Sequence, residues 1–196
     1  ERVVERGLVR RQGWLVERRG RRVLRWRRQL GRRRRERELV MAKRPAWARR
    51  FLDEADFAAI HRAIVAAEAR TSAEIRVHLE RRVPRRLFRG RPGPLDRARR
   101  VFRRLGMHRT AERHGVLIYL AVDDRTLAVV GDAGIHEKVG DRHWEGVRDG
   151  MLERLRAGAP RAALVGAIEA VGRELAAYFP RRPGDVNELS DEVNVV

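Results

Sequence analysis

Hydrophobic residues recur with two different periods in the first half of the chain after about residue 52. Four apolar residues with helical spacing come first: Phe57, Ile60, Ile64 and Ala67. Asp53, which precedes them, suits a helix N-cap. Residues 73–80 then alternate between apolar and polar, which predicts a strand with one buried face. After a loop rich in Arg, Gly and Pro, residues 95–105 return to the helical period. This part is therefore predicted to be helix, strand, helix.

The second half begins with a continuous apolar run, residues 116–122, which predicts a central strand buried on both faces. A tight turn leads into residues 126–130, so these two strands should form an antiparallel hairpin. Two more helices are expected at about residues 141–156 and 160–178, followed by a short acidic tail at 185–196. The element order predicts an α/β fold, a three-layer α/β/α sandwich with helices on both faces of a small mixed sheet.

The same element order predicts which strand ends meet. A crossover connection favours a parallel arrangement of the first two strands, and the hairpin makes the third strand antiparallel. The start of the first strand and the end of the third then share one edge of the sheet. Carboxylates and an imidazole that converge from separate loops form oxygen-rich cation sites. We therefore predict a site for a divalent cation, Ca²⁺ or Mg²⁺, with Arg113 as an anion contact and four ligands: Glu74, Asp132, His136 and Asp141.

These residues also have purely structural interpretations, which the sequence leaves open. Asp132 lies in a glycine-flanked turn that it can stabilise, and Asp141 suits a helix N-cap. Glu74 can pair with Arg113, or with Arg76 two residues along the same face of the strand.

Composition narrows the class of protein. The chain has no cysteine, which excludes disulfides and thiolate metal sites. No apolar run approaches the roughly 18 residues of a membrane helix, and no secretory signal is visible, so we expect a cytoplasmic protein. The net charge of +19 suggests nucleic acid, but 44 of the 46 basic residues are arginine, a bias that GC-rich coding sequences produce by themselves. Gly-x-Gly-x-x-Gly, Walker, His-Glu-x-x-His and Gly-x-Ser-x-Gly motifs are absent from the sequence.

Residues 1–40 differ from the rest of the chain. They contain only seven residue types and carry +11 of the +19 net charge. They are typical of an untranslated G-rich leader read as protein, with Met41 as the true start. The alternative is a basic arm that binds RNA or anionic lipid, with Trp14 and Trp26 as anchors. The predicted organisation has three parts: an Arg-rich low-complexity segment at 1–45, an α/β domain at 46–184 and an acidic tail at 185–196.

An ordered set of short motifs carries a family resemblance: residues 73–77, 110–119, 131–140, Trp144 and 187–193. Across roughly residues 52–193 the chain resembles the TPM domain family, and most closely its short bacterial members without a membrane anchor. The resemblance implies an α/β/α sandwich, divalent-cation binding by loops at one sheet edge, and roles in the assembly or maintenance of membrane protein complexes. It also implies phosphatase activity, which is attributed to part of the family.

Three functions follow from these observations. The first is a non-catalytic interaction module whose acidic edge binds Ca²⁺ or Mg²⁺ and stiffens loops that contact a membrane-associated partner protein. The second is a weak metal-dependent phosphomonoesterase, with Asp132 or Glu74 holding the ion, His136 donating a proton and Arg113 stabilising phosphate charge. The third is nucleic-acid binding through arginine, which depends on residues 1–40. The sequence favours the first, because no residue stands out as a nucleophile beside a base.

Overall fold

A computed structural model of the chain describes residues 44–84, 93–110, 112–185 and 187–196. The predicted leader or basic arm, residues 1–40, lies outside this part, as does most of the arginine-rich loop before residue 93. Residues from Pro45 onward form one structural unit.

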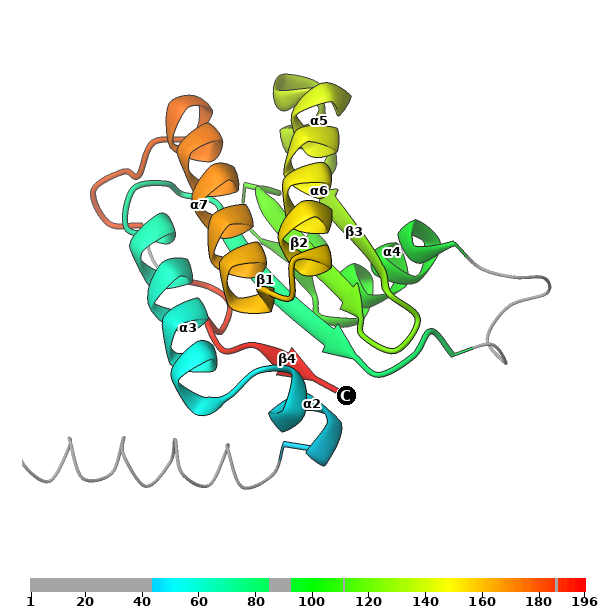
Figure 1. Cartoon of the computed structure of the whole chain (residues 1–196). Helices are drawn as coiled ribbons and strands as arrows, with labels where there is room; N and C mark the ends of the chain where they lie inside the picture. Colours follow the sequence, from blue (N-terminus) through cyan, green and yellow to red (C-terminus); the bar gives the residue numbers. More distant parts are fainter. Residues whose placement is uncertain (1–43, 85–92, 111, 186) are drawn as a thin grey trace, which may run out of the picture. The chain divides into compact units, whose positions relative to one another are not determined.

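The centre of this unit is a mixed sheet with the strand order β3-β2-β1-β4. Its strands are β1 (Glu74–Glu80), β2 (Gly115–Ala121), β3 (Thr126–Gly131) and β4 (Asn194–Val195). Strand β1 pairs in parallel with β2 and β4, and β2 pairs antiparallel with β3 (Figure 1). The parallel crossover and the hairpin predicted from the sequence are therefore confirmed. Strand β3 is the edge strand on one side of the sheet.

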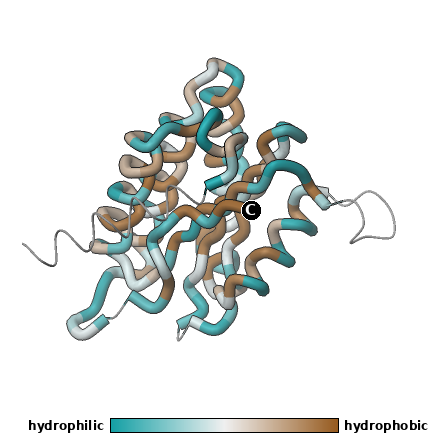
Figure 2. The backbone as a smooth tube through the Cα atoms, turned by 90° about the horizontal axis from the view of Figure 1, so that it is seen from below, coloured by the Kyte–Doolittle hydropathy of each residue, from teal (hydrophilic) through white to brown (hydrophobic). Residues whose placement is uncertain are grey.

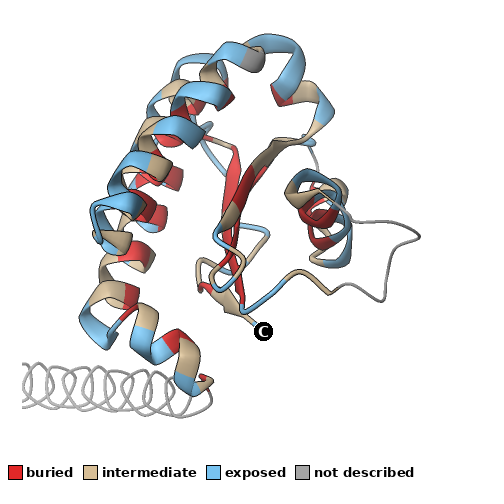
Figure 3. Ribbon diagram, turned by 45° about the vertical axis from the view of Figure 1, so that its right-hand side comes forward, coloured by how far each residue is buried: buried red, intermediate tan, exposed pale blue. Residues whose placement is uncertain are grey.

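Helices cover both faces of the sheet, as predicted (Figure 3). Helix α7 packs between α3 and α6 on one face, and α4 packs against β2 and β3 on the other. The helical segments are α2 (Ala46–Phe51), α3 (Glu54–Glu68), α4 (Pro94–Arg104), the 3₁₀ turn η2 (Met107–Arg109), α5 (Ala133–Val139), α6 (Asp141–Arg156) and α7 (Pro160–Tyr178). The fold is thus an α/β sandwich with a small mixed sheet.

Local sequence explains where the first long helix begins. The Asp53 side chain accepts a hydrogen bond from the Asp56 N–H at 2.7 Å, and the Asp56 carboxylate accepts one from the Asp53 N–H at 3.1 Å. This capping box satisfies two backbone donors that a helix start leaves unpaired. Behind it the predicted apolar stripe is buried, with Ile60 and Ile64 fully inaccessible to solvent. Figure 2 shows hydrophobic residues concentrated along the strands.

Two segments differ from the sequence prediction. The loop expected to carry His136 is the short helix α5, which Asp132 caps and the fully buried Ile135 anchors. The segment 185–196, expected as an acidic tail, returns to the sheet and supplies β4 beside β1. Both elements are too short to show a period, and contacts with distant residues hold them in place.

Strand β1 was expected to have one buried face, and it has two. On the face predicted to be polar, His78 is fully buried and Glu80 is 3% exposed. The polar residues that alternate along this strand are therefore buried, and they do not form a face exposed to solvent.

Two glycines in the helical layer give a matched pair for testing the packing. A Cβ at Gly172 of α7 would lie 2.6 Å from the Ala67 Cβ of α3, whereas a Cβ at Gly146 of α6 would meet nothing within 4 Å. We expect Gly172→Ala to reduce the free energy of unfolding by about 1–3 kcal/mol through overpacking. Gly146→Ala should increase it by about 0.5–1 kcal/mol, because glycine disfavours a helix interior. Urea unfolding measures both, and equal stabilisation by the two substitutions would contradict the close helix contact.

Candidate functional site

The sheet register places the predicted strand ends on one rim. Glu74 is paired with Gly115 across β1 and β2, and the Asp132 N–H donates to the Gly115 carbonyl at 2.9 Å. Glu74 and Asp132 are therefore separated by the width of one intervening strand, which corresponds to about 10 Å between their backbones. The topology prediction is confirmed in this respect, and the side chains then determine what the rim can bind.

The Glu74 carboxylate is engaged by the returning C-terminal segment. It accepts hydrogen bonds from the backbone N–H groups of Glu188 at 2.9 Å and Leu189 at 3.2 Å. Burial raises the pKa of Glu74, the two backbone hydrogen bonds oppose that rise, and the nearby Glu188 and Asp191 carboxylates add to it. Neither Arg76 nor Arg113, the partners considered from sequence, takes these positions. Glu74 anchors the segment that leads into β4.

A second group of carboxylates lies beside Glu74, and sequence reasoning missed it. Glu68, the last residue of α3, is only 8% exposed, and its Oε1 accepts from the Ile75 N–H at 2.8 Å. Burial is the main reason that the pKa of Glu68 rises to about 8, and the neighbouring Glu74 and Asp191 carboxylates raise it further. The half-buried Arg76 interacts electrostatically with all three acids. Arg76 thus supplies positive charge to this cluster.

Asp132 and His136 lie at the other end of the rim, on α5. Asp132 Oδ1 accepts from the Ala133 N–H at 2.8 Å, while its Oδ2 is buried and has no hydrogen-bond partner among the described residues. His136 follows one helical turn later. Helix α6 begins at Asp141 behind the N-cap Gly140, and the Asp141 side chain lies outside what the structure describes. Asp132 is therefore the predicted ligand with a carboxylate oxygen left over.

The predicted ligands do not form a preorganised metal-binding site in the structure. Within the described residues, no group of three or more His, Asp or Glu side chains is arranged to hold a metal ion. Glu74 faces the C-terminal segment, whereas Asp132 caps α5. Any cation at this rim would consequently be bound by few protein ligands and would keep much of its water.

Arg113 lies on the same rim in the loop before β2. Its side chain is exposed, and its backbone adopts a left-handed conformation with φ of 55°. Glu112 fixes this loop, because its carboxylate accepts from the Ser72 hydroxyl at 3.0 Å and from the Arg182 guanidinium at 2.8 Å. The Arg113 carbonyl lies against Gly134 of α5, at 3.7 Å from where a Cβ would be. Arg113 is thus accessible to an anion near α5.

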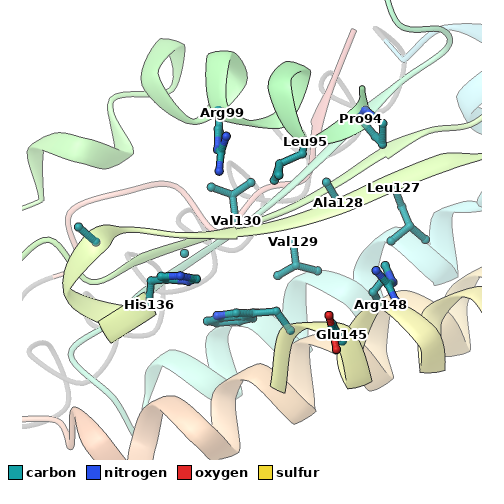
Figure 4. Close-up of a pocket in the computed structure, with 13 residues that line it drawn as sticks. Pro94, Leu95, Arg99, Leu127, Ala128, Val129, Val130, His136, Glu145 and Arg148 are labelled. Carbon is teal, nitrogen blue, oxygen red and sulfur yellow. The ribbon is translucent and has the colours of Figure 1, made fainter. Parts of the chain in front are cut away.

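A cleft of about 570 Å³ runs along β3 between α4 and α6 (Figure 4). Val130 points toward Leu95 and Arg99 of α4, and Val129 points toward Glu145 and Arg148 of α6. The cleft follows both sides of the edge strand, and its lining is mostly apolar.

The cleft and the rim meet at α5. His136 and Ala133 line the end of the cleft, next to Asp132. Trp144 of α6 also lines it, and a Cβ at Gly131 would lie 3.2 Å from the Trp144 ring, so a larger residue there would require the ring to shift by a few tenths of an ångström. The cation ligands predicted from sequence therefore adjoin a surface that sequence reasoning did not identify.

A buried polar network lies further along the face of the sheet that α4 covers. The Arg97 guanidinium donates to both Glu80 oxygens at 2.7–3.2 Å, and the Tyr119 hydroxyl also donates to Glu80. His78 Nε2 lies 3.9 Å from the same carboxylate, and its Nδ1 is 2.6 Å from the Asn194 side-chain oxygen of β4. This network ties α4, β1, β2 and β4 together. Its hydrogen bonds join side chains of these elements to one another, which gives the network a structural role.

Comparison with known proteins agrees with this fold. A protein-family model described as "TPM domain" matches residues 48–174. The NMR structure of the BA42 protein from the psychrophilic bacterium Bizionia argentinensis sp. nov. is similar, with 38% sequence identity and a TM-score of 0.66 over 74% of this chain and 96% of that chain. No curated protein matches the chain. Within the described residues, no helix has the length and apolar character needed to cross a membrane.

Proposed function

The chain belongs to the TPM domain family, and we propose that its domain is a non-catalytic interaction module that binds a divalent cation at Asp132. The observation that carries this proposal is the position of α5. The helix begins at a carboxylate with one unused oxygen and ends the apolar cleft along β3. A cation bound there would act on the surface that a partner protein contacts. The family resemblance suggests a partner in a membrane protein complex.

The chemistry of Asp132 suits a cation with few protein ligands. Its Oδ2 is buried and unpartnered in the described part of the chain, and such an atom costs free energy unless a ligand or water satisfies it. Mg²⁺ commonly binds through one or two carboxylates and retains several waters. Because Oδ2 is buried, a hydrated ion would bind it only once the Asp132 side chain turns this oxygen toward the solvent, near His136 and the start of α6 at Asp141. Ca²⁺, which takes more protein oxygens, is the alternative ion.

Cation binding would affect the cleft through α5. Asp132 holds the first turn of this helix, and His136 lies one turn further along its surface at the end of the cleft. An ion on Asp132 would neutralise the carboxylate and fix the junction between β3 and α5. The expected consequence is a stiffer end to the cleft, rather than the creation of a catalytic centre.

Titration with MgCl₂ or CaCl₂ should raise the melting temperature, because a ligand that binds only the folded chain stabilises it. At 100 times its Kd the ion contributes about 2.7 kcal/mol, which is about 5–10 °C for a domain of this size. Asp132→Asn should abolish the shift while keeping the helix cap, since asparagine is an equally good N-cap. Glu153→Gln, which removes an exposed carboxylate near the far end of α6, is the matched control and should retain the shift.

The same variants separate this proposal from phosphatase activity. The proposal expects no turnover of a generic phosphoester that depends on Asp132. A metal-dependent turnover that is present in the wild-type chain and in Glu153→Gln but lost in Asp132→Asn would contradict the non-catalytic role. A missing thermal shift with both ions would contradict the cation.

A further inference from the structure

The edge strand β3 has backbone groups that face away from the sheet. Asp132 and Gly115 form a hydrogen-bonded pair, and such pairs alternate along an antiparallel ladder with pairs that are not hydrogen-bonded to each other. The residues in the non-bonded positions therefore direct their N–H and C=O groups outward: Leu127, Val129 and Gly131. No described strand pairs with that edge. It offers three donors and three acceptors in strand geometry.

The sequence of this strand lacks the residues that usually prevent an edge strand from pairing with another chain. Natural edge strands usually carry lysine, proline, an inward-pointing charge or a bulge that prevents pairing with another chain. Residues 126–131 read Thr-Leu-Ala-Val-Val-Gly and contain neither a charge nor a proline. In a chain with 37% charged residues, an uncharged strand at the sheet edge is a feature to be explained. Occupation by a bound strand explains it.

The walls of the cleft have the shape and charge for one added strand. Helices α4 and α6 flank β3 on its two faces, so the space beside the edge is a slot with walls on both sides (Figure 4). The α6 wall presents Trp144, whose ring lies against Gly131, together with Glu145 and Arg148, toward which Val129 points. The α4 wall presents Leu95, which is 41% exposed, and the exposed Arg99. The α6 side therefore combines an aromatic ring with one acidic and one basic side chain, which balance in charge, whereas the α4 side carries the positive charge of Arg99 and suits a carboxylate.

We propose that a partner protein adds an extended acidic segment to β3 as a fifth strand of the sheet. Side chains of an added strand alternate between the faces. Apolar residues would face Trp144, and every second residue, an aspartate or glutamate, would face Arg99. A second copy of this chain fits less well, because it would bring its own α4 and α6 into the slot and place a second Arg99 against the first. This inference rests on the proposed interaction role and is independent of the cation.

The test uses the full ¹⁵N-labelled chain and two capped synthetic peptides. One alternates valine with glutamate, and the other replaces every glutamate with lysine. We expect the glutamate peptide to slow amide hydrogen exchange at Leu127, Val129 and Gly131 and to bind at least tenfold more tightly than the lysine peptide. Arg99→Glu changes an exposed residue and should reverse the preference. Arg103→Glu, an exposed position on the same helix that does not line the cleft, should leave it unchanged.

Three outcomes would overturn the inference: equal binding of the two peptides, protection of amides elsewhere only, or self-association of the chain that protects these same three amides. Repeating the titration with MgCl₂ separates this inference from the cation. Peptide binding that Mg²⁺ does not affect supports the strand addition and counts against the cation's role. A thermal shift with Mg²⁺ without any peptide binding would support the proposed cation site and contradict the proposed strand addition.

Discussion

Arg97→Met is expected to reduce the free energy of unfolding by about 3–5 kcal/mol, the usual cost of removing one partner from a buried ion pair. The reason lies in the surroundings of Glu80. Its side chain is 4% exposed and that of Arg97 is 7% exposed, with Nη2 and Oε2 at 2.7 Å. Without the guanidinium, the Glu80 carboxylate would keep its charge in a place that water barely reaches. Urea unfolding at neutral pH measures the loss.

The controls for this prediction come from the same helix and the same network. Arg103→Met removes an exposed arginine from α4 and should change stability by less than about 0.5 kcal/mol. Adding Glu80→Gln to Arg97→Met removes the stranded charge while leaving an acceptor for the Tyr119 hydroxyl, so the double variant should recover part of the loss. A double variant less stable than Arg97→Met would contradict the assignment of the cost to an unpaired buried carboxylate.

The pH dependence of this network follows from the same contacts. Burial alone would raise the pKa of Glu80, but the nearby His78 ring and the hydrogen bonds from Arg97 and Tyr119 outweigh it and lower the pKa to about 2. Because the folded pKa is below the ordinary value, the network stabilises the fold above about pH 4.5. That contribution is lost as the pH falls from about 4.5 toward 2. Glu80 therefore makes the domain sensitive to acid.

Glu68→Gln is expected to stabilise the protein, and increasingly so as the pH rises. The pKa of Glu68 is raised to about 8 by burial and neighbouring acids. The unfolded chain releases this proton above about pH 4.5, whereas the folded chain keeps it until about pH 8. Wild-type stability should therefore decrease over that interval, by at most about 1.4 kcal/mol per pH unit. Glutamine retains the acceptor for the Ile75 N–H and removes the titration.

Unfolding at pH 5 and pH 8 measures this effect. The stability difference between Glu68→Gln and wild type should grow by up to about 4 kcal/mol between the two values. Glu54→Gln, at an exposed position in the first turn of α3, is the matched control and should show a small difference at both. A Glu68→Gln effect that is the same at pH 5 and pH 8 would mean that this carboxyl does not titrate as described.

The local sequence pattern was sufficient to predict the elements that are long enough to show a hydrophobic period. The helical stripe behind Asp53 and the apolar run at β2 predicted their elements because burial there repeats with the period of the backbone. Helix α5 and strand β4 were not predicted. Helix α5 has seven residues and β4 has two, and each is held by contacts that a short sequence window does not contain.

The candidate site shows the same division. Topology alone was sufficient to place Glu74 and Asp132 on one rim, because strand direction fixes which ends meet. The partners of Glu74 were not predictable, since they are backbone groups 114 and 115 residues away. The burial of Glu68 was not predictable either, because its acidic neighbour Asp191 belongs to the returning C-terminal segment. The uncharged sequence of β3 was the one available signal for the cleft, and it reads simply as a strand until its edge position is known.

The most direct test of the account is amide hydrogen exchange of the wild-type chain with and without saturating MgCl₂, and with CaCl₂ in parallel. If a cation on Asp132 fixes the junction of β3 and α5, exchange should slow at residues 132–139 with at least one ion, and Asp132→Asn should remove the effect. Slowing confined to the segment around Glu188, or no change in residues 132–139 with either ion, would contradict it.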